Sequence, residues 1–151
     1  MTIWFSAKSL EWCWLSNLHP CRIDLDGLKW KSVEHYYQAQ KYVGQPAFDA
    51  IRGAKDGFAA LKAGSNRSLV PRPDWNEIKL TVMNKAIAAK FNQNTAHVAK
   101  LLATGDHVLC HQSNSDLFWG CNPKGEGENH LGKILMEVRQ GLQMKAAPRE
   151  G

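Results

Sequence analysis

Two segments of the chain repeat apolar residues at the spacing of an α-helix, and they constrain the fold more than any other feature. In the segment 131–142, leucine, isoleucine and valine recur at positions 131, 134, 135, 138 and 142, which form one apolar face. The segment 75–91 shows the same spacing at positions 75, 78, 82 and 86. Each face must be buried against other elements, so the sequence predicts a core built largely by helices.

Short strands are expected around these helices. Ile3–Phe5 and His107–Cys110 are predicted to be extended, and Cys21–Leu25 and Leu28–Trp30 flank Asp26-Gly27, a dipeptide favoured in two-residue hairpin turns. A length of 151 residues fits one domain with its own core. The predicted fold class is therefore α+β, a mostly helical single domain with a few short strands.

Four further helices are predicted, at Val33–Val43, Pro46–Arg52, Asp56–Ala63 and Thr95–Ala103. Ser32 and Thr95 are the expected N-caps of the first and last of these, and glycines at 44, 64 and 105 are expected to end helices. Asp74 and Glu77 form the D-x-x-E pattern of a capping box before the helix 75–91.

The formal net charge is +5, from 19 lysines and arginines against 14 aspartates and glutamates. This excess suits phosphorylated partners, but the basic residues are scattered rather than gathered in a tail. No stretch approaches the ~20 apolar residues of a membrane span, and the first ten residues do not resemble a signal peptide. We therefore expect a cytoplasmic protein that does not enter a membrane.

The four cysteines, at positions 13, 21, 110 and 121, include no C-x-x-C pair. A zinc ribbon or a redox motif is therefore not indicated. Because disulfides are rare in the cytosol, we expect four reduced thiols, some of them buried.

The segment 32–41 carries an unusual set of polar side chains. Glu34, Tyr37, Gln38 and Lys41 stand at i, i+3, i+4 and i+7, so they share one face of the predicted helix. Glu34 lies in the first turn, where the helix dipole favours a charged carboxylate. The spacing fits either a solvated polar face or one wall of a functional site.

A second unusual segment, 113–129, leads from Asp116 and Trp119-Gly120 into a stretch with Gly125, Gly127 and Asn129. A glycine-rich loop before a helix can bind phosphate through its backbone N–H groups. The loop matches neither of the established phosphate-loop patterns, so it also fits an ordinary surface loop with Asn129 as N-cap.

Together these segments resemble the NADAR (YbiA-like) superfamily. Residues 30–41 follow the pattern W-x-S-x-E-H-x-x-Q-A-x-K, and residues 116–132 contain D-x-x-W-G followed by G-x-G-x-N-x-L-G. Leu15-Ser16-Asn17 and the helical stretch 83–91 also resemble that family. The resemblance implies a NADAR domain over residues 1–144, followed by a tail, 145–151, that is expected to fray.

The resemblance implies a hydrolase that cuts an N-glycosidic bond of ribose, with no metal or redox cofactor. One branch of the family hydrolyses phosphorylated ribosylamino-pyrimidine intermediates of riboflavin synthesis, and another removes ADP-ribose from guanine in DNA. The expected partner is a nucleotide-like substrate, which includes ADP-ribosylated DNA in the second case. Which substrate applies, and the oligomeric state, stay open at this point.

Breaking an N-glycosidic bond builds positive charge on the sugar, which a nearby carboxylate stabilises. Glu34 and Asp116 are the expected catalytic carboxyls, with one protonating the leaving base. Lys41 is a catalytic candidate through a Schiff base to C1′ of the opened ribose, or else binds phosphate. Direct attack by water and the Schiff base stay open as alternatives.

The expected substrate-binding residues fall into three groups: Trp119, Trp30 and Tyr37 for stacking on the base; Gly120, Gly125, Gly127, Asn129 and Arg67 around phosphate; and Gln38 and Asn17 from the family motifs. Arg67 departs from the family pattern, because Gly64-Ser65-Asn66-Arg67 stands where relatives often have a tighter Gly-Arg pair.

Two other functions fit parts of the sequence. A module that binds ADP-ribose or a nucleotide without catalysis would be expected to lose the carboxyls, but Glu34 and Asp116 are both present. A nucleic-acid binding protein would fit the charge and the six tryptophans, but the sequence shows no recognition helix or zinc finger.

Overall fold

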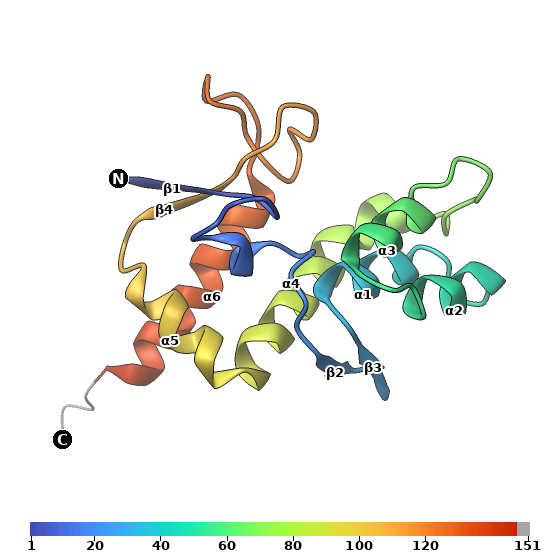
Figure 1. Cartoon of the computed structure of the whole chain (residues 1–151), viewed down its shortest axis with the longest axis horizontal. Helices are drawn as coiled ribbons and strands as arrows, with labels where there is room; N and C mark the ends of the chain where they lie inside the picture. Colours follow the sequence, from blue (N-terminus) through green and yellow to red (C-terminus); the bar gives the residue numbers. More distant parts are fainter. Residues whose placement is uncertain (148–151) are drawn as a thin grey trace.

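Helix α4 (Trp75–Gln93) runs through the middle of the molecule, and helix α6 (His130–Ala146) packs against it. The computed structural model, shown in Figure 1, describes residues 1–147. Helices α1 (Val33–Gln40), α2 (Pro46–Arg52) and α3 (Gly57–Gly64) lie on one side of α4, and α5 (Thr95–Ala103) lies on the other side with α6. This mostly helical arrangement confirms the predicted fold class.

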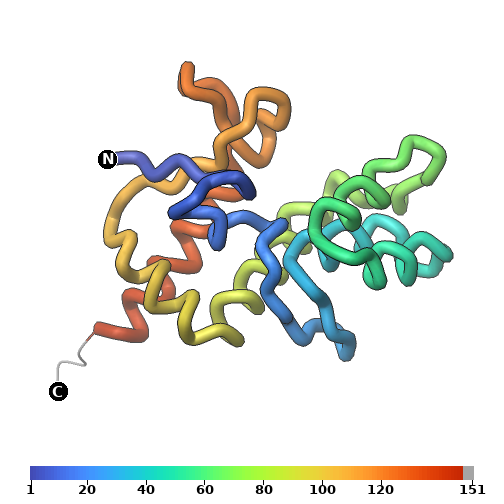
Figure 2. The backbone as a smooth tube through the Cα atoms, in the orientation of Figure 1, coloured from blue at the N-terminus to red at the C-terminus, as the bar shows by residue number. Residues whose placement is uncertain are grey.

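The strands are short and form two separate pairs. Strands β1 (Thr2–Phe5) and β4 (Val108–His111) are parallel, with Ile3 opposite Leu109. Figure 2 shows how this pairing brings the start of the chain beside a segment much later in the sequence. Strands β2 (Ile23–Leu25) and β3 (Leu28–Trp30) form the predicted hairpin. A short 3-10 helix, η1 (Cys13–Leu15), lies between the two N-terminal strands.

The hairpin turn has the geometry that its dipeptide predicts. Asp26 and Gly27 have φ angles of 55° and 77°, and both central residues of a type I′ turn need positive φ. The Asp26 carboxylate accepts a hydrogen bond of 2.6 Å from the Tyr36 hydroxyl and pairs with Lys85. The turn is thereby fixed to both α1 and α4.

The core lies where α4 meets α1 and α6. Its completely buried apolar side chains come from strands β1 and β4 as well as from helices α1, α3, α4 and α5, so the short strands and the helices share one core. These side chains are Phe5, Ala39, Ala60, Ala86, Phe91, Leu101 and Leu109. Among residues 1–147, no helix is both long enough and apolar enough to cross a membrane.

Some helix boundaries differ from the prediction. Helix α1 ends at Gln40 rather than Val43, because the Lys41 amide turns back to the carbonyls of Gln38 and Ala39 in a tighter final turn. Strand β4 lies one residue later than predicted. Helix α6 continues through Ala146, so the first residues of the predicted tail are helical, and 148–151 lie outside the described residues.

The predicted caps had mixed outcomes. The Ser32 hydroxyl accepts a hydrogen bond from the His35 amide, which confirms it as the N-cap of α1. The capping box at Asp74 is wrong, because the Asp74 carboxylate binds the Arg72 guanidinium instead of the helix. Helix α5 includes Thr95, and the residue before it, Asn94, occupies the cap position.

The prediction of four reduced thiols is wrong for one pair. Cys110 and Cys121 are joined by a disulfide, whereas Cys13 and Cys21 are free. The chain returns to β4 after the loop, and the Cys121 amide donates a hydrogen bond of 2.9 Å to the His111 carbonyl. This pairing brings together two cysteines that are 11 residues apart in the chain and belong to no common sequence motif.

Gly132 lies where α6 packs tightly against β4. A Cβ at this position would overlap the Leu109 carbonyl oxygen and lie 2.6 Å from Oδ1 of Asn129. We expect Gly132→Ala to lower the free energy of unfolding by about 1–3 kcal/mol, as an overpacked site does. Chemical denaturation measures this change.

Gly141→Ala, on the same helix, is the matched control, because no atom of residues 1–147 lies within 4 Å of the added Cβ. This variant should be more stable by about 0.5–1 kcal/mol, since alanine favours a helix over glycine. Equal effects of the two substitutions would contradict the close packing of α6 on β4.

Candidate active site

A cavity of about 340 Å³ lies between the N-terminal segment, α1, α3, α4 and the loop after β4. Its walls contain most of the chemically active side chains that the sequence analysis singled out. The lining residues are Ser16, Asn17, Leu18, Glu34, Tyr37, Gln38, Lys41, Leu61, Ser65, Met83, His111, Asp116, Trp119 and Leu131.

The polar stripe of α1 forms one wall of this cavity. Glu34, Tyr37 and Gln38 are all buried, and Glu34 is only 7% exposed. The Glu34 amide donates a hydrogen bond of 3.1 Å to the Asn17 carbonyl, which holds the first turn of α1 against the N-terminal segment. The stripe is therefore not a solvated face.

Gln38 orients the Glu34 carboxyl. Its Nε2 donates a hydrogen bond of 2.8 Å to Oε1 of Glu34, while its own Oε1 is buried without a partner within the described chain. The amide packs on Gly64 in α3, where an added Cβ would lie 2.7 Å from Cβ and Cδ of Gln38. The absence of a side chain at Gly64 makes room for this arrangement.

Burial sets the protonation of the two central groups. It raises the pKa of Glu34, and the charge of Asp116 raises it further, while the Gln38 hydrogen bond and Lys41 oppose the shift. Burial also lowers the pKa of Lys41, against the attraction of Glu34, and Lys79 lowers it further. Burial thus shifts the pKa of each group toward its uncharged form, and these are the forms that can donate a proton and attack carbon respectively.

The loop after β4 supplies Asp116 and Trp119. Oδ1 of Asp116 accepts a hydrogen bond of 3.0 Å from the Trp119 amide, and the Asp116 amide donates to Oγ of Ser113. The Trp119 indole N–H donates to the Tyr37 hydroxyl at 3.2 Å, with the two rings edge to face. Trp119 is buried, whereas Asp116 is exposed at the mouth of the cavity.

The cavity does not include every residue that we expected in the site. Trp30 is a correction: it is 1% exposed, its indole N–H donates to the Leu25 carbonyl, and its ring packs on Tyr36 and Phe48 in the core. Strand alternation turns it inward, so it has no free face for a base. Arg67 is exposed on the connection between α3 and α4 and does not line the cavity.

The glycine-rich loop also lies outside the lining. Asn129 has a left-handed backbone with a φ of 52°, and its side-chain amide binds the Leu109 carbonyl and the His111 amide, so it does not cap α6. Gly120 packs on the His111 carbonyl, Gly127 packs on Gly120, and Gly125 occupies an exposed turn. These residues shape the loop from outside the cavity.

Sequence reasoning missed several lining residues, of which His111 carries the most chemistry. Burial lowers the pKa of His111, against the attraction of Asp116, so its imidazole is favoured in the neutral form. Its position at the end of a predicted strand, directly before the loop, was the available signal. Met83 was also missed; its sulfur accepts a hydrogen bond of 3.3 Å from the Asn17 amide.

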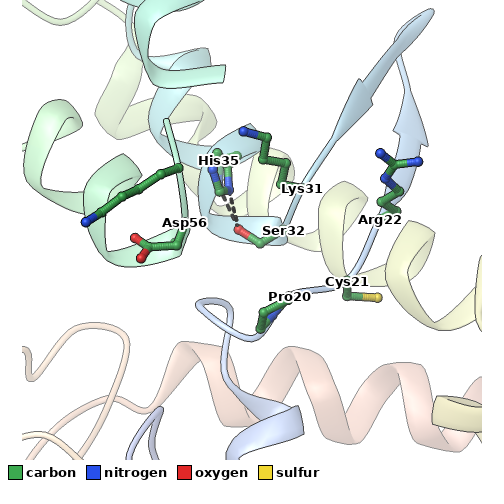
Figure 3. A pocket seen from close by; sticks show the side chains of 9 residues that line it. Pro20, Cys21, Arg22, Lys31, Ser32, His35 and Asp56 are labelled. Atoms are coloured by element: carbon green, nitrogen blue, oxygen red, sulfur yellow. Dashed lines mark hydrogen bonds between the residues drawn. The ribbon is translucent and has the colours of Figure 1, made fainter. Parts of the chain in front are cut away.

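A second cavity, of about 370 Å³, is lined by residues 20–22, the start of α1 and the start of α3 (Figure 3). The His35 Nε2–H donates to the Ala54 carbonyl at 3.0 Å, which leaves Nδ1 to accept from the Ser32 hydroxyl at 2.7 Å. Asp56 caps α3 by accepting from the Ala59 amide. Because these polar groups are already paired within the protein, this cavity is the weaker candidate for catalysis.

Comparison with known proteins adds the family. The sequence profile described as NADAR domain matches residues 4–143. The chain belongs to the NADAR domain family. The resemblance inferred from the two motifs is therefore confirmed, and the cavity described above lies within the NADAR domain.

Three proteins similar to this chain are a riboflavin biosynthesis protein, an N-glycosidase and YbiA. The chain is 41% identical over 144 residues to the riboflavin biosynthesis protein VVA0006 of Vibrio vulnificus (strain YJ016), which covers 95% of this chain but 39% of that protein. It is 39% identical over 149 residues to the N-glycosidase Npun_R5314 of Nostoc punctiforme, covering 95% and 94%. The NMR structure of the Escherichia coli protein YbiA matches with a TM-score of 0.85 and 34% identity, over 99% of this chain and 91% of that one.

We predict that Gly64→Ala will raise the pKa of Glu34 further. The added methyl group displaces Gln38, and the hydrogen bond that Gln38 donates is the largest effect opposing the upward shift. A ¹³C NMR titration of the Glu34 carboxyl measures this pKa directly. Gly53→Ala is the control, because its Cβ would lie at ordinary contact distance from the Asp49 and Ala50 carbonyl oxygens, at 3.4 and 3.9 Å. An unchanged Glu34 pKa in Gly64→Ala would show that Gln38 does not orient the carboxyl.

Proposed function

We propose that this NADAR protein hydrolyses the N-glycosidic bond between a ribose phosphate and a nitrogen base. The observation that carries the proposal is the buried Glu34 carboxyl, whose raised pKa suits it to protonate a leaving base. The names of the relatives from Nostoc and Escherichia coli, both N-glycosidases, support the same reaction.

In the first mechanism, Glu34 donates its proton to the base nitrogen as the bond to C1′ breaks. The sugar then carries oxocarbenium-like positive charge, which the Asp116 carboxylate stabilises or quenches by activating a water molecule. The exposed position of Asp116 at the cavity mouth is consistent with water activation. Tyr37 and Trp119, joined by their hydrogen bond, provide the aromatic surface for the base.

In the second mechanism, Lys41 is the nucleophile. Its amine attacks C1′ of the ring-opened ribose, the base leaves, and water hydrolyses the resulting imine. The lowered pKa of Lys41 supports this route, and its Nζ lies 5.6 Å from the centre of the Tyr37 ring. Borohydride reduction during turnover separates the two mechanisms, because only the imine leaves a stable adduct on Lys41.

For the substrate, we propose a phosphorylated ribosylamino-pyrimidine. The riboflavin biosynthesis name of the Vibrio relative supports this class, although this chain matches only 39% of that protein. A volume of about 340 Å³ is at the small end of ligand pockets, which run from roughly 300 to 1,000 Å³, and suits one nucleotide-sized ligand.

A second candidate substrate is guanine in DNA that carries ADP-ribose. The observation in its favour is the second cavity, which is lined by the basic residues Arg22, Lys31 and Lys55 and so has a basic rim. Its wall at residues 20–22 follows, in the chain, the segment 16–18 that lines the candidate site. Such a rim suits the additional phosphates of a nucleic-acid substrate. Incubating the protein with both substrates and following release by mass spectrometry distinguishes them, and binding without release would favour a non-catalytic module.

We expect Glu34→Gln to lower turnover of the preferred substrate by about 10²–10⁴-fold, the usual contribution of a general acid. In the wild type, activity should fall as the pH rises through the raised pKa of Glu34, because the acid form is lost. Rates measured across pH with both proteins check this expectation.

The same substitution should stabilise the fold at neutral pH. The folded-state pKa of Glu34 is raised, so the folded protein holds this proton more tightly than the unfolded chain and loses stability as the carboxyl ionises. Glutamine removes this cost. Glu137→Gln, on the exposed face of α6, is the control and should change neither property. Full activity in Glu34→Gln would refute the assignment.

A further inference from the structure

Lys90 is a lysine buried in the interior of the protein. It lies on α4 and is 2% exposed. Its ammonium donates hydrogen bonds to the backbone carbonyl of Trp14 at 2.7 Å and to that of Ser16 at 3.2 Å. These are long-range contacts, joining the central helix to the N-terminal segment.

No carboxylate forms an ion pair with Lys90 in the described part of the chain, residues 1–147. The titratable groups that face it are the thiols of Cys13 and Cys21 and the imidazoles of His19 and His97. Burial accordingly lowers the pKa of Lys90 to about 8. A buried charge without a counter-charge is costly, and the two hydrogen bonds to backbone carbonyls offset part of that cost.

Of the two carbonyls that Lys90 holds, that of Ser16 belongs to one wall of the candidate active site, and that of Trp14 lies two residues before it. Ser16, Asn17 and Leu18 line the cavity, and the Asn17 carbonyl accepts the hydrogen bond from the Glu34 amide. The contacts therefore run from Lys90 through Ser16 and Asn17 to Glu34. Apart from the Asn17–Met83 contact, these hydrogen bonds are what ties this wall to α4 in the described residues.

We infer that Lys90 is a positioning residue of the glycosidase site: its two hydrogen bonds hold the Ser16–Leu18 wall in the place where substrate binds. It acts through the backbone and does not touch the substrate. This inference rests on the proposed function for its kinetic test, and on the structure alone for its spectroscopic test.

The kinetic test compares Lys90→Met with Lys85→Met. Methionine is unbranched and apolar like the lysine stem, is one atom shorter, and donates no hydrogen bond. KM for the ribosylamino-pyrimidine phosphate should rise about tenfold or more, which corresponds to the loss of a hydrogen bond from a charged group, while kcat changes little. Lys85, on the same helix, pairs with Asp26 in the hairpin, so its substitution should leave KM unchanged.

A merely structural role gives a different result. Partial unfolding reduces the active fraction, which lowers the apparent kcat and leaves KM unchanged, and that outcome would overturn the inference. In the wild type, KM should also rise as the pH passes about 8, where Lys90 loses its charge and its hydrogen bonds weaken, and Lys90→Met should lack this rise. A rise of equal size in both proteins would assign the effect to a group other than Lys90 and overturn the inference.

The spectroscopic test needs no substrate. In ¹H–¹⁵N spectra of Lys90→Met, the amide signals of Asn17, Leu18 and Glu34 should shift, while those of α6 stay in place. If the wild type cleaves neither proposed substrate, the proposed function fails, and these shifts still decide the position of the wall. Unshifted signals at all three residues would overturn the role of Lys90 even in an active enzyme.

Discussion

The hydrogen bond from the Glu34 amide to the Asn17 carbonyl is the contact on which the site depends. The first amides of a helix have no partner within the helix, and most helices satisfy them with a side chain or water. Here one of them is satisfied by a backbone segment from another part of the fold, while the Ser32 hydroxyl satisfies its neighbour at His35. This contact holds the first turn of α1 against the Ser16–Leu18 wall of the cavity, with the Glu34 carboxyl buried.

Burial explains the chemistry of the cavity better than any single pair of charges does. It is the largest cause of the pKa shifts of Glu34, Lys41 and His111 alike, and in each case it favours the uncharged form. The cavity thus brings an acid, an amine and an imidazole together, each with its pKa shifted by burial. Asp116, by contrast, is exposed, so water can reach its carboxylate.

The sequence predicts the parts of this site that depend on local geometry. The spacing of Glu34, Tyr37, Gln38 and Lys41 places them on one helical face whatever surrounds it, and the structure brings all four to the cavity. Trp30 was expected in the site because it begins the motif that contains Glu34. It lies instead on a strand, opposite Ile23, and the alternation of the strand buries its side chain in the core. For His111 the only signal was its place directly before the loop, and the position of Lys90 was beyond sequence reasoning, since its contacts join segments far apart in the chain. The same reason hid the Cys110–Cys121 pair, which meets only because the loop returns to β4.

Asn129 has a consequence for the behaviour of the protein in solution. A sheet of two strands exposes an unpaired edge, and such an edge invites other chains to add to it and aggregate. The Asn129 amide binds the Leu109 carbonyl and the His111 amide along β4, so a single side chain fills hydrogen-bonding positions that a neighbouring strand would use. Directly after the end of β4, Gln112 forms a β-bridge with Cys121, so the loop also covers this part of the strand edge. The loop that borders the cavity therefore also serves as a guard against strand addition, and changes made there to alter substrate choice bear on solubility as well.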